Sequence, residues 1–354
     1  MLRGPNRRRV LEGLGGAVLS ARIGSQKAAA QSSATKIRVG IVPLISAGPV
    51  FIAQARSFFK KVELDVEFVS FADGALAIPA LVAGELDVAG TTLNAGFFNA
   101  VSKKAPYILV LDRGSEKPGA GSLQIAVSND LFRAGLARPE DAGLLKGKRI
   151  SIQAPGGIDQ YIVGVALQRA GLNPRSDVVW NSGLSYPDIV RSMGIGQTDA
   201  AQIPLPLGFQ VEKNSFGKLV FPGSAIEPNA QLACWAMSTT FLAANPSAAI
   251  RFAMANIHAG RMFNEAAAAK DPETIKIISD ATKLPAALIE SAAPRWTWFS
   301  EDGMPNTDSC IRQGGFWNGV MQMVRSGDIN KKLLFDLSFC IEANRQLANR
   351  NPFI

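Results

Sequence analysis

Hydrophobic and polar positions follow two alternating periods along this chain, a pattern that predicts an α/β fold. Residues 36–42 alternate in the manner of a strand, and Pro49 suits the first position of a helix over residues 49–60. The same succession then returns, with strands predicted at 62–71, 86–89 and 107–111 and helices at 74–83 and 91–101. Strands that alternate with helices of this length favour a mostly parallel sheet covered on both faces.

The pattern changes at residues 112–121, which are rich in turn-forming residues and have no hydrophobic period. We interpret this stretch as the approach to a crossing between two lobes, with residues 123–127 as the crossing strand. A second α/β unit follows, with strands predicted at 149–153, 177–180, 200–203 and 219–221 and helices at 159–170 and from residue 188. Residues 231–237 then predict the returning strand, and the chain is mainly helical from residue 239. Lobe 1 is therefore expected to comprise residues 36–120 and 232–354, and lobe 2 residues 121–231.

Two segments, residues 75–92 and 188–206, have closely similar patterns. Each predicts an amphipathic helix, a turn with glycine and aspartate, a short apolar strand, and small polar or proline-rich residues at the strand end. Because open α/β sheets bind ligands beyond the carboxyl ends of their strands, the two segments indicate two equivalent places facing one cleft.

The first thirty residues have the order of a secretory signal: a basic region, an apolar region over residues 10–23, and small residues ending at Ala30. The run from Arg7 to Arg9, followed by Val10 and Leu11, fits a twin-arginine signal. The alternative is a disordered basic tail. The apolar run is shorter than the ~20 residues that a membrane span needs. We expect cleavage near Ala30 and a periplasmic mature protein.

This segment also accounts for most of the net positive charge. The whole chain has a formal net charge of +8, but residues 31–354 contain 31 Lys and Arg against 28 Asp and Glu. The remaining basic residues form only short pairs, such as Lys60 with Lys61, and make no basic stripe. We therefore expect no nucleic-acid partner.

The reactive side chains are few and scattered. The three cysteines, Cys234, Cys310 and Cys340, lack metal-ligand spacing. Buried thiols are favoured, although a bridge between Cys310 and Cys340 is an alternative in an oxidising compartment. The single histidine, His258, has apolar helical neighbours, and nucleophile-elbow, phosphate-loop and histidine-pair metal motifs are all missing from the sequence. We expect neither an enzyme nor a cofactor.

Several segments together resemble the periplasmic binding proteins of nitrate/sulfonate/taurine-type ABC importers. In lobe 1 they are residues 37–43, 52–55 with 58–61, 64–66, and 81–89; in lobe 2 they are residues 145–150, 154–156 and 196–201. The resemblance covers nearly the whole mature chain and rests on the order of these segments. It implies a type II periplasmic binding protein: two α/β lobes joined by two strands, closing over a small molecule and delivering it to a membrane permease. We expect such a receptor to be a monomer.

The candidate ligand contacts lie in strand-end loops and at helix starts, where hydroxyls and backbone amides can point into the cleft. They are Ser46, Gly48, Thr91, Thr92, Asn94, Gly156, Gly157, Ile158, Asp159, Tyr186, Pro204 and Leu205. For the hydroxyl residues, helix capping is an equal alternative. Trp235 is expected in the core. Arg113 is expected to be a solvated loop arginine; the alternative is that it reaches the cleft from the crossing and pairs with an anion.

Two features bear on the ligand. The loop at residues 155–158 resembles an anion cradle, but Asp159 follows this loop. If Asp159 only caps the helix, it has little effect on ligand binding. If its side chain points into the cleft, it favours a hydroxyl, amide or amine group of the ligand. The first of the similar segments ends in Thr91 and Thr92, whereas the second ends in the apolar residues 203–206. This contrast favours a small organic ligand with one polar side, with a sulfonate or carboxylate as candidate groups.

Two other functions remain open at this point. A ligand-sensing module with a partner other than a permease would have the same lobes. Some proteins with this fold are thiamin-pyrimidine synthases, which use cysteine and histidine chemistry that three dispersed cysteines and one histidine do not match.

Overall fold

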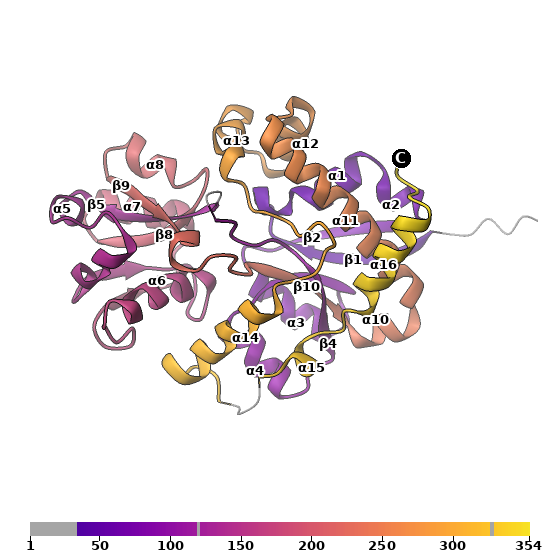
Figure 1. The fold of residues 1–354 in the computed structure, drawn as a ribbon, viewed down its shortest axis with the longest axis horizontal. Coiled ribbons are helices and arrows are strands. Elements are labelled where there is room, and N and C mark those ends of the chain that lie inside the picture. Colours follow the sequence, from indigo (N-terminus) through magenta and orange to yellow (C-terminus); the bar gives the residue numbers. More distant parts are fainter. Residues whose placement is uncertain (1–33, 119–120, 326–328) are drawn as a thin grey trace, which may run out of the picture. The chain divides into compact units, whose positions relative to one another are not determined.

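The computed structural model describes residues 34–118, 121–325 and 329–354; the predicted signal, residues 1–30, lies outside the described residues. Residues 34–354 form one unit that contains two five-stranded sheets (Figure 1). The first sheet has the order β2-β1-β3-β10-β4 and the second the order β7-β6-β8-β5-β9. The first sheet consists of β1 (Thr35–Ile41), β2 (Leu64–Ser70), β3 (Val88–Thr92), β4 (Tyr107–Asp112) and β10 (Ala233–Ser238). The second consists of β5 (Leu123–Ser128), β6 (Arg149–Ser151), β7 (Val179–Asn181), β8 (Ala200–Pro204) and β9 (Gly217–Pro222).

Each sheet contains one strand that runs against its neighbours. β10 is antiparallel to β3 and β4, and β5 is antiparallel to β8 and β9, whereas β1 pairs in parallel with β2 and β3, and β6 with β7 and β8. The expected crossing strands at 123–127 and 231–237 are thus wrong in their role, since β5 and β10 are inner strands of a sheet. The chain passes from the first sheet to the second between β4 and β5, and returns between β9 and β10, where the helix Gly223–Ile226 lies. An inner strand satisfies its backbone groups on both sides, which a strand spanning two lobes cannot do.

Helices of the first half cover both faces of the first sheet. They are α1 (Gly48–Ala55), α2 (Phe58–Lys61), α3 (Ala77–Val82) and α4 (Ala95–Ser102), with short 3-10 turns η1 (Ile45–Ala47) and η2 (Gly74–Leu76). The helix predicted at 49–60 is broken into two, because Ser57 adopts a left-handed conformation with φ of 58°. Alternate residues of β10 belong to different cores: Trp235 and Met237 pack on the α1 side, Cys234 and Ala236 on the α3 side.

The helices of the second half are short apart from α6. They are α5 (Asn129–Arg133), the 3-10 segment η3 (Pro139–Leu145), α6 (Ile158–Arg169), α7 (Tyr186–Gly194), α8 (Phe209–Lys213) and α9 (Gly223–Ile226). The α6 face of the second sheet shares a core with the α3 and α4 side of the first, and α7 and α8 cover the other face. One apolar core therefore continues from one sheet to the other.

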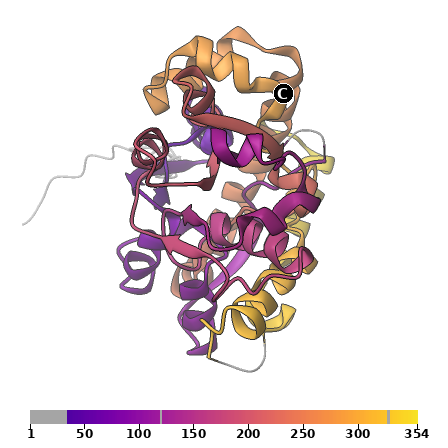
Figure 2. The ribbon, with the colours of Figure 1, turned by 90° about the vertical axis from the view of Figure 1, so that its left-hand side faces the viewer.

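The part of the chain after β10 is mainly helical, as predicted. It comprises α10 (Thr239–Ala244), α11 (Pro246–Ala269), α12 (Pro272–Thr282), α13 (Ala286–Ala292), η4 (Ala293–Arg295), α14 (Thr307–Gly315), the π-helical turn η5 (Phe316–Val320), α15 (Lys331–Leu334) and α16 (Ser338–Asn349). In both views, the orange segment with α12 and α13 lies at the upper edge of the ribbon, and the segment with α14 lies toward the lower edge (Figures 1 and 2). Among the described residues, every helix falls short of the length and apolarity that a bilayer crossing requires.

This helical part reaches the second sheet. The Phe316 ring meets the Tyr161 ring of α6 edge-on at 5.2 Å, and the Trp317 indole donates a hydrogen bond to the Leu93 carbonyl at 3.0 Å. Glu227 accepts from Arg312 of α14 at 2.9 Å and lies 3.5 Å from Arg169 of α6. The segment after α13 also pairs with the first crossing, since Ser115 and Trp298 exchange backbone hydrogen bonds.

Candidate functional site

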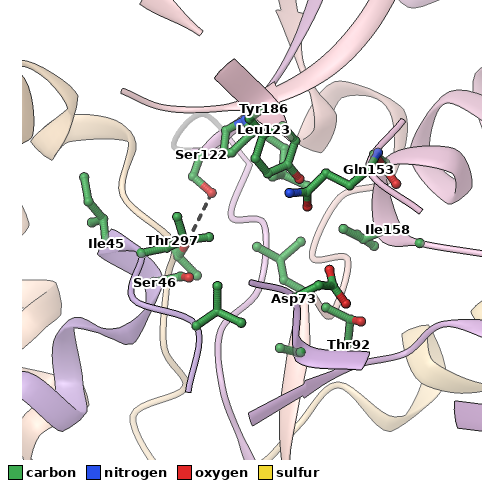
Figure 3. A pocket seen from close by; sticks show the side chains of 18 of the residues that line it. Ile45, Ser46, Asp73, Thr92, Ser122, Leu123, Gln153, Ile158, Tyr186 and Thr297 are labelled. Carbon is green, nitrogen blue, oxygen red and sulfur yellow. Dashed lines mark hydrogen bonds between the residues drawn. The ribbon is translucent and has the colours of Figure 1, made fainter. Parts of the chain in front are cut away.

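A cavity of about 330 Å³ lies between the two sheets (Figure 3). Its wall is built at the carboxyl ends of β1, β2, β3, β4, β6, β7 and β8, and at the beginnings of the reversed strands β5 and β10. Sheet topology places these ends together, so loops that are far apart in sequence share one wall. The volume lies in the range of pockets that hold small organic molecules.

On the first-sheet side, two strands are followed by polar residues that line the cavity. Asp73 follows β2 and accepts a hydrogen bond from the Ala75 amide at 2.7 Å. Thr92 ends β3, and Asn94 caps α4 by accepting from the Phe97 amide at 2.8 Å. The Asn94 amide group also donates to the Thr92 hydroxyl at 3.0 Å, which orients both side chains. Figure 3 shows Asp73 directed across the cavity toward Ile158 and Gln153.

On the second-sheet side, the loop between β6 and α6 contributes Gln153 and Gly157, and the first turn of α6 contributes Ile158 and Asp159. The Asp159 carboxylate is buried and accepts from the Gln153 amide at 2.6 Å and from the Gln160 amide at 2.9 Å. It therefore both orders the loop and lines the cavity. Burial raises its pKa to about 7; these backbone hydrogen bonds oppose the shift and the nearby Asp73 carboxylate adds to it.

The remaining wall of the second sheet is largely apolar. Pro204, Leu205 and Pro206 follow β8, and the Leu205–Pro206 peptide bond is cis. Tyr186, the first residue of α7, is buried beside them, and its pKa is raised by burial and further by the Asp159 and Asp73 carboxylates. Two acidic groups and a phenol thus lie near one another at this end of the cavity.

Arg113 lines the cavity, although it is not among the twelve candidate contacts. The expectation of a solvated loop arginine was wrong: the residue is 6% exposed, and its guanidinium lies 5.2 Å from the Trp235 ring. Its Nε and Nη2 atoms are buried without a hydrogen-bond partner among the described residues. Burial lowers the pKa of Arg113 to about 10, against the raising effect of Asp112, so it stays charged at neutral pH. Gly90 makes room for this side chain, since a Cβ there would lie 2.2 Å from Nε.

The segment at residues 295–297 closes the cavity from the helical part of the chain. The hydroxyls of Thr297 and Ser122 are 3.1 Å apart, and the Arg295 guanidinium lies 5.2 Å from the Phe209 ring of α8. No sequence signal pointed to this segment, which is distant in sequence from every other part of the wall except Leu284. Asp73 and Arg113 did have a signal, because each follows a predicted strand as Thr92 does.

The structure places nine of the twelve predicted contacts on the cavity wall. They are Ser46, Thr92, Asn94, Gly157, Ile158, Asp159, Tyr186, Pro204 and Leu205. Three lie outside it. Gly48, at the start of α1, packs against the Phe263 ring of α11. The Thr91 hydroxyl is buried and donates a hydrogen bond to the Thr92 carbonyl. The Gly156 carbonyl accepts a hydrogen bond from the Ala95 amide at 3.1 Å.

The scattered reactive residues lie elsewhere. The three cysteines are buried and free, and Cys340 donates to the Asp302 carbonyl at 3.0 Å. The His258 ring packs against the rings of Phe58 and Phe353, which also contact each other, and burial lowers the pKa of His258. Among the described residues, no group of three or more His, Cys, Asp or Glu side chains is arranged to hold a metal ion. Trp235 is a core residue, as expected.

A family profile described as the NMT1-like family matches residues 30–279. The chain is 22% identical over 256 residues to YtlA of Bacillus subtilis, a candidate binding protein, covering 72% of this chain and 71% of that one. It spans only 37% and 57% of two further relatives, the cyanobacterial nitrate-import proteins NrtC of Synechococcus elongatus and NrtA of Nostoc.

Solved structures share the fold. The periplasmic nitrate-binding protein NrtA of Synechocystis superposes with a TM-score of 0.72 at 15% identity, covering 90% of this chain and 91% of that one. The alkanesulfonate-binding protein SsuA of Xanthomonas axonopodis, bound to MOPS, gives 0.63 at 19% identity, covering 87% and 97%. These likenesses confirm the predicted type II periplasmic binding protein fold.

Proposed function

The chain belongs to the NMT1-like family, and on that premise we propose that it is the solute-binding protein of an ABC importer. It captures a small organic molecule between its two sheets and delivers it to a membrane permease. The observation that carries the proposal is the cavity itself, whose wall combines the ends of strands from both sheets with the crossing segments. A ligand that contacts both halves binds the closed arrangement better than the open one, which is the requirement for a closing receptor.

The cavity favours an organic ligand over a small inorganic anion. Its volume of about 330 Å³ exceeds what a four-atom anion fills, and apolar side chains make up much of the wall. They include Ile45, Leu123, Ile158, Leu205 and Trp296. NrtA binds nitrate and SsuA binds alkanesulfonates by their descriptions; the size and apolar lining of this cavity favour an organic ligand over nitrate.

The proposal is tested first by finding the ligand. Native mass spectrometry of freshly purified protein should detect a bound small molecule, and thermal unfolding should shift upward when nitrate, alkanesulfonates, carboxylates or a metabolite extract supplies a ligand. The absence of both a bound molecule and any thermal shift across this panel would contradict the proposal.

A matched pair of variants ties binding to this cavity. Ile158→Trp places a larger side chain on the cavity wall, whereas Ile195→Trp makes the same change at a position that is 70% exposed. We expect Ile158→Trp to abolish binding and Ile195→Trp to retain it, with both variants folded by circular dichroism. Equal binding by the two would place the ligand elsewhere.

We also propose export through the twin-arginine route, with cleavage near Ala30 and a periplasmic mature protein. The support is the sequence of the first thirty residues. Replacing Arg8 and Arg9 by lysine should leave the protein in the cytoplasmic fraction, and the N-terminus of the periplasmic protein should begin just after Ala30.

We also propose a division into lobe 1 (36–120 and 232–354) and lobe 2 (121–231), which is supported by the two sheets. We expect the two lobes to close over the ligand.

The mature protein is proposed to be a monomer that changes no bond of its ligand. Light scattering should give the mass of a single chain, and the ligand should be recovered with unchanged mass after prolonged incubation.

A further inference from the structure

The charged groups of the cavity are divided between two regions, and in neither is the charge balanced. Asp73 and Asp159 lie at one end with Tyr186, while Arg113 lies where the crossing leaves β4. Arg295 lines the wall as well, and its guanidinium lies 5.2 Å from the Phe209 ring. None of these four charged residues has an ion-pair partner among the described residues, so the cavity holds separated, uncompensated charges of both signs.

The two carboxylates come from opposite halves of the protein. Asp73 follows β2 of the first sheet, and Asp159 lies in the first turn of α6 beside the second sheet. Both side chains line the same cavity, where Asp73 is directed across toward Ile158 (Figure 3), and the Asp73 charge adds to the rise that burial causes in the pKa of Asp159. When the halves approach, like charges are brought together in a partly dehydrated space, which opposes closure unless a cation or a hydrogen-bond donor lies between them.

Arg113, in contrast to the two carboxylates, requires an anionic partner. Its side chain is more than nine-tenths buried, lines the cavity, and leaves Nε and Nη2 without acceptors. The neighbouring Asp112 does not supply them, because its two oxygens accept from the Gly114 amide, the Gln231 side chain and the Ser300 amide. A buried guanidinium without acceptors is costly, and an anionic ligand group is the partner whose charge and geometry suit it.

A water molecule beside Arg113 would supply an acceptor for the guanidinium but no negative charge. A hollow of about 10 Å³ lies between Arg113 and Asn256, whose side-chain oxygen also lacks a partner. That volume is close to the least that holds one water. A water there would bridge the guanidinium to the amide oxygen of Asn256, but it would bring no negative charge.

From this arrangement we propose that the ligand is a small organic zwitterion. Its anionic group binds Arg113, its ammonium group lies between Asp73 and Asp159, and its hydrocarbon part packs on the apolar wall. The inference rests on the proposed function and names its substrate class. A plain anion would leave the two carboxylates facing each other, and a plain cation would leave Arg113 without a partner.

The test compares matched probes by isothermal titration calorimetry. The probes are the ω-aminoalkanoates of three to six carbons, each with the alkanoate and the alkylammonium of the same length. We expect the best aminoalkanoate to bind at least tenfold more tightly than its alkanoate, since each added charged hydrogen bond is worth roughly a factor of ten or more. An alkanoate that binds as well as its amino analogue, or no binding by any zwitterion, overturns the inference.

Variants test which residues bind the ammonium end and the anionic end of the ligand. The double variant Asp73→Asn with Asp159→Asn should reduce the advantage of the aminoalkanoate over the alkanoate to less than about threefold, and alkanoate binding should not weaken, because two charges that oppose closure around a plain anion are removed. Arg113→Gln should weaken both probes at least tenfold, and Arg113→Lys, which keeps the charge, should weaken them less. The control is Asp188→Asn, which removes a carboxylate outside the cavity and should change nothing.

The comparison of probes in the unmodified protein needs no variant to fold. The outcome also separates this inference from the proposed function. A carried ligand identified as a plain anion would leave the solute-binding proposal standing and overturn the zwitterion, whereas a protein that binds neither these probes nor the wider panel would overturn both.

Discussion

The backbone amide of Ala95, at the start of α4, donates a hydrogen bond to the carbonyl of Gly156, in the loop before α6, at 3.1 Å. This contact joins the first-sheet half to the second-sheet half beside the cavity. Gly156 has a φ of +79°, and a Cβ on it would lie 2.8 Å from the Ala95 Cβ. The glycine is therefore required both by its backbone conformation and by the close approach of the two segments.

Gly156→Ala should weaken ligand binding because the added methyl group clashes with Ala95 only when the two halves are in contact. Gly171→Ala is the matched control, since Gly171 has a φ of +77° but no atom near its would-be Cβ. Both variants should lose about 1 kcal/mol of stability from backbone strain. Gly156→Ala alone should also raise the Kd, on the order of tenfold by titration of the ligand found by native mass spectrometry. Equal affinities of the two variants would count against a role of this contact in closure.

Gly164→Ala should destabilise the packing of the C-terminal part on α6. A Cβ at Gly164 would lie 2.4 Å from the Phe316 ring, so the ring or the helix must move. Overpacking of this kind costs about 1–3 kcal/mol, measured as the free energy of unfolding in urea. Gly143→Ala, where nothing lies within 4 Å of the new methyl group, should change it little. If both substitutions cost the same, the Phe316 contact is not a source of stability.

Glu227→Gln should lower the unfolding free energy by about 1–3 kcal/mol, because the nearly buried carboxylate is the shared partner of Arg169 and Arg312. The comparison variant is Glu67→Gln, which breaks a pair with Lys36 whose two side chains are 54% and 66% exposed. Exposed pairs contribute little, so its midpoint in urea should hardly move. A similarly small effect of Glu227→Gln would mean that water screens the contacts of Glu227 with the two arginines in solution.

The ligand-free protein should become less stable as the pH rises from about 5.5 to 8, in part through Asp159. Burial raises the pKa of Asp159 to about 7, above its ordinary value, so in this window the folded state holds a proton that the unfolded state has released. Burial shifts the pKa of Glu116 in the same sense, whereas the lowered pKa of His258 acts oppositely.

Asp159→Asn isolates the contribution of this carboxyl group to the pH dependence. The difference between the urea midpoints at pH 5.5 and 8 should shrink by the share of Asp159, even if the variant is less stable at both pH values. The control Asp188→Asn, whose carboxyl pKa is lowered by hydrogen bonds with Ser185 and Arg191, should leave that difference unchanged. An unchanged difference in Asp159→Asn would show that its carboxyl group titrates normally.

Local sequence signals predicted the order of the elements well. β1, β3 and β8 lie within a few residues of their expected positions, because alternation of apolar residues is imposed by each strand on its own sequence. The same strand-end rule that singled out Thr92 also applies to Asp73 and Arg113, which were not included among the candidates. The burial of Arg113 could not be predicted, since it depends on Gly90 and Trp235, which lie on two other segments.

The sequence by itself determined the alternation of strands and helices, the strand-end positions of most polar wall residues, and the family resemblance, because these depend on neighbouring residues and on motif order. Only the tertiary structure decided which strands lie inside each sheet, that Thr297 meets Ser122 across 175 residues of sequence, and that Arg113 is buried without a partner. The physical reason is that sheet order and burial are set by contacts between distant segments, whose energies no local pattern records.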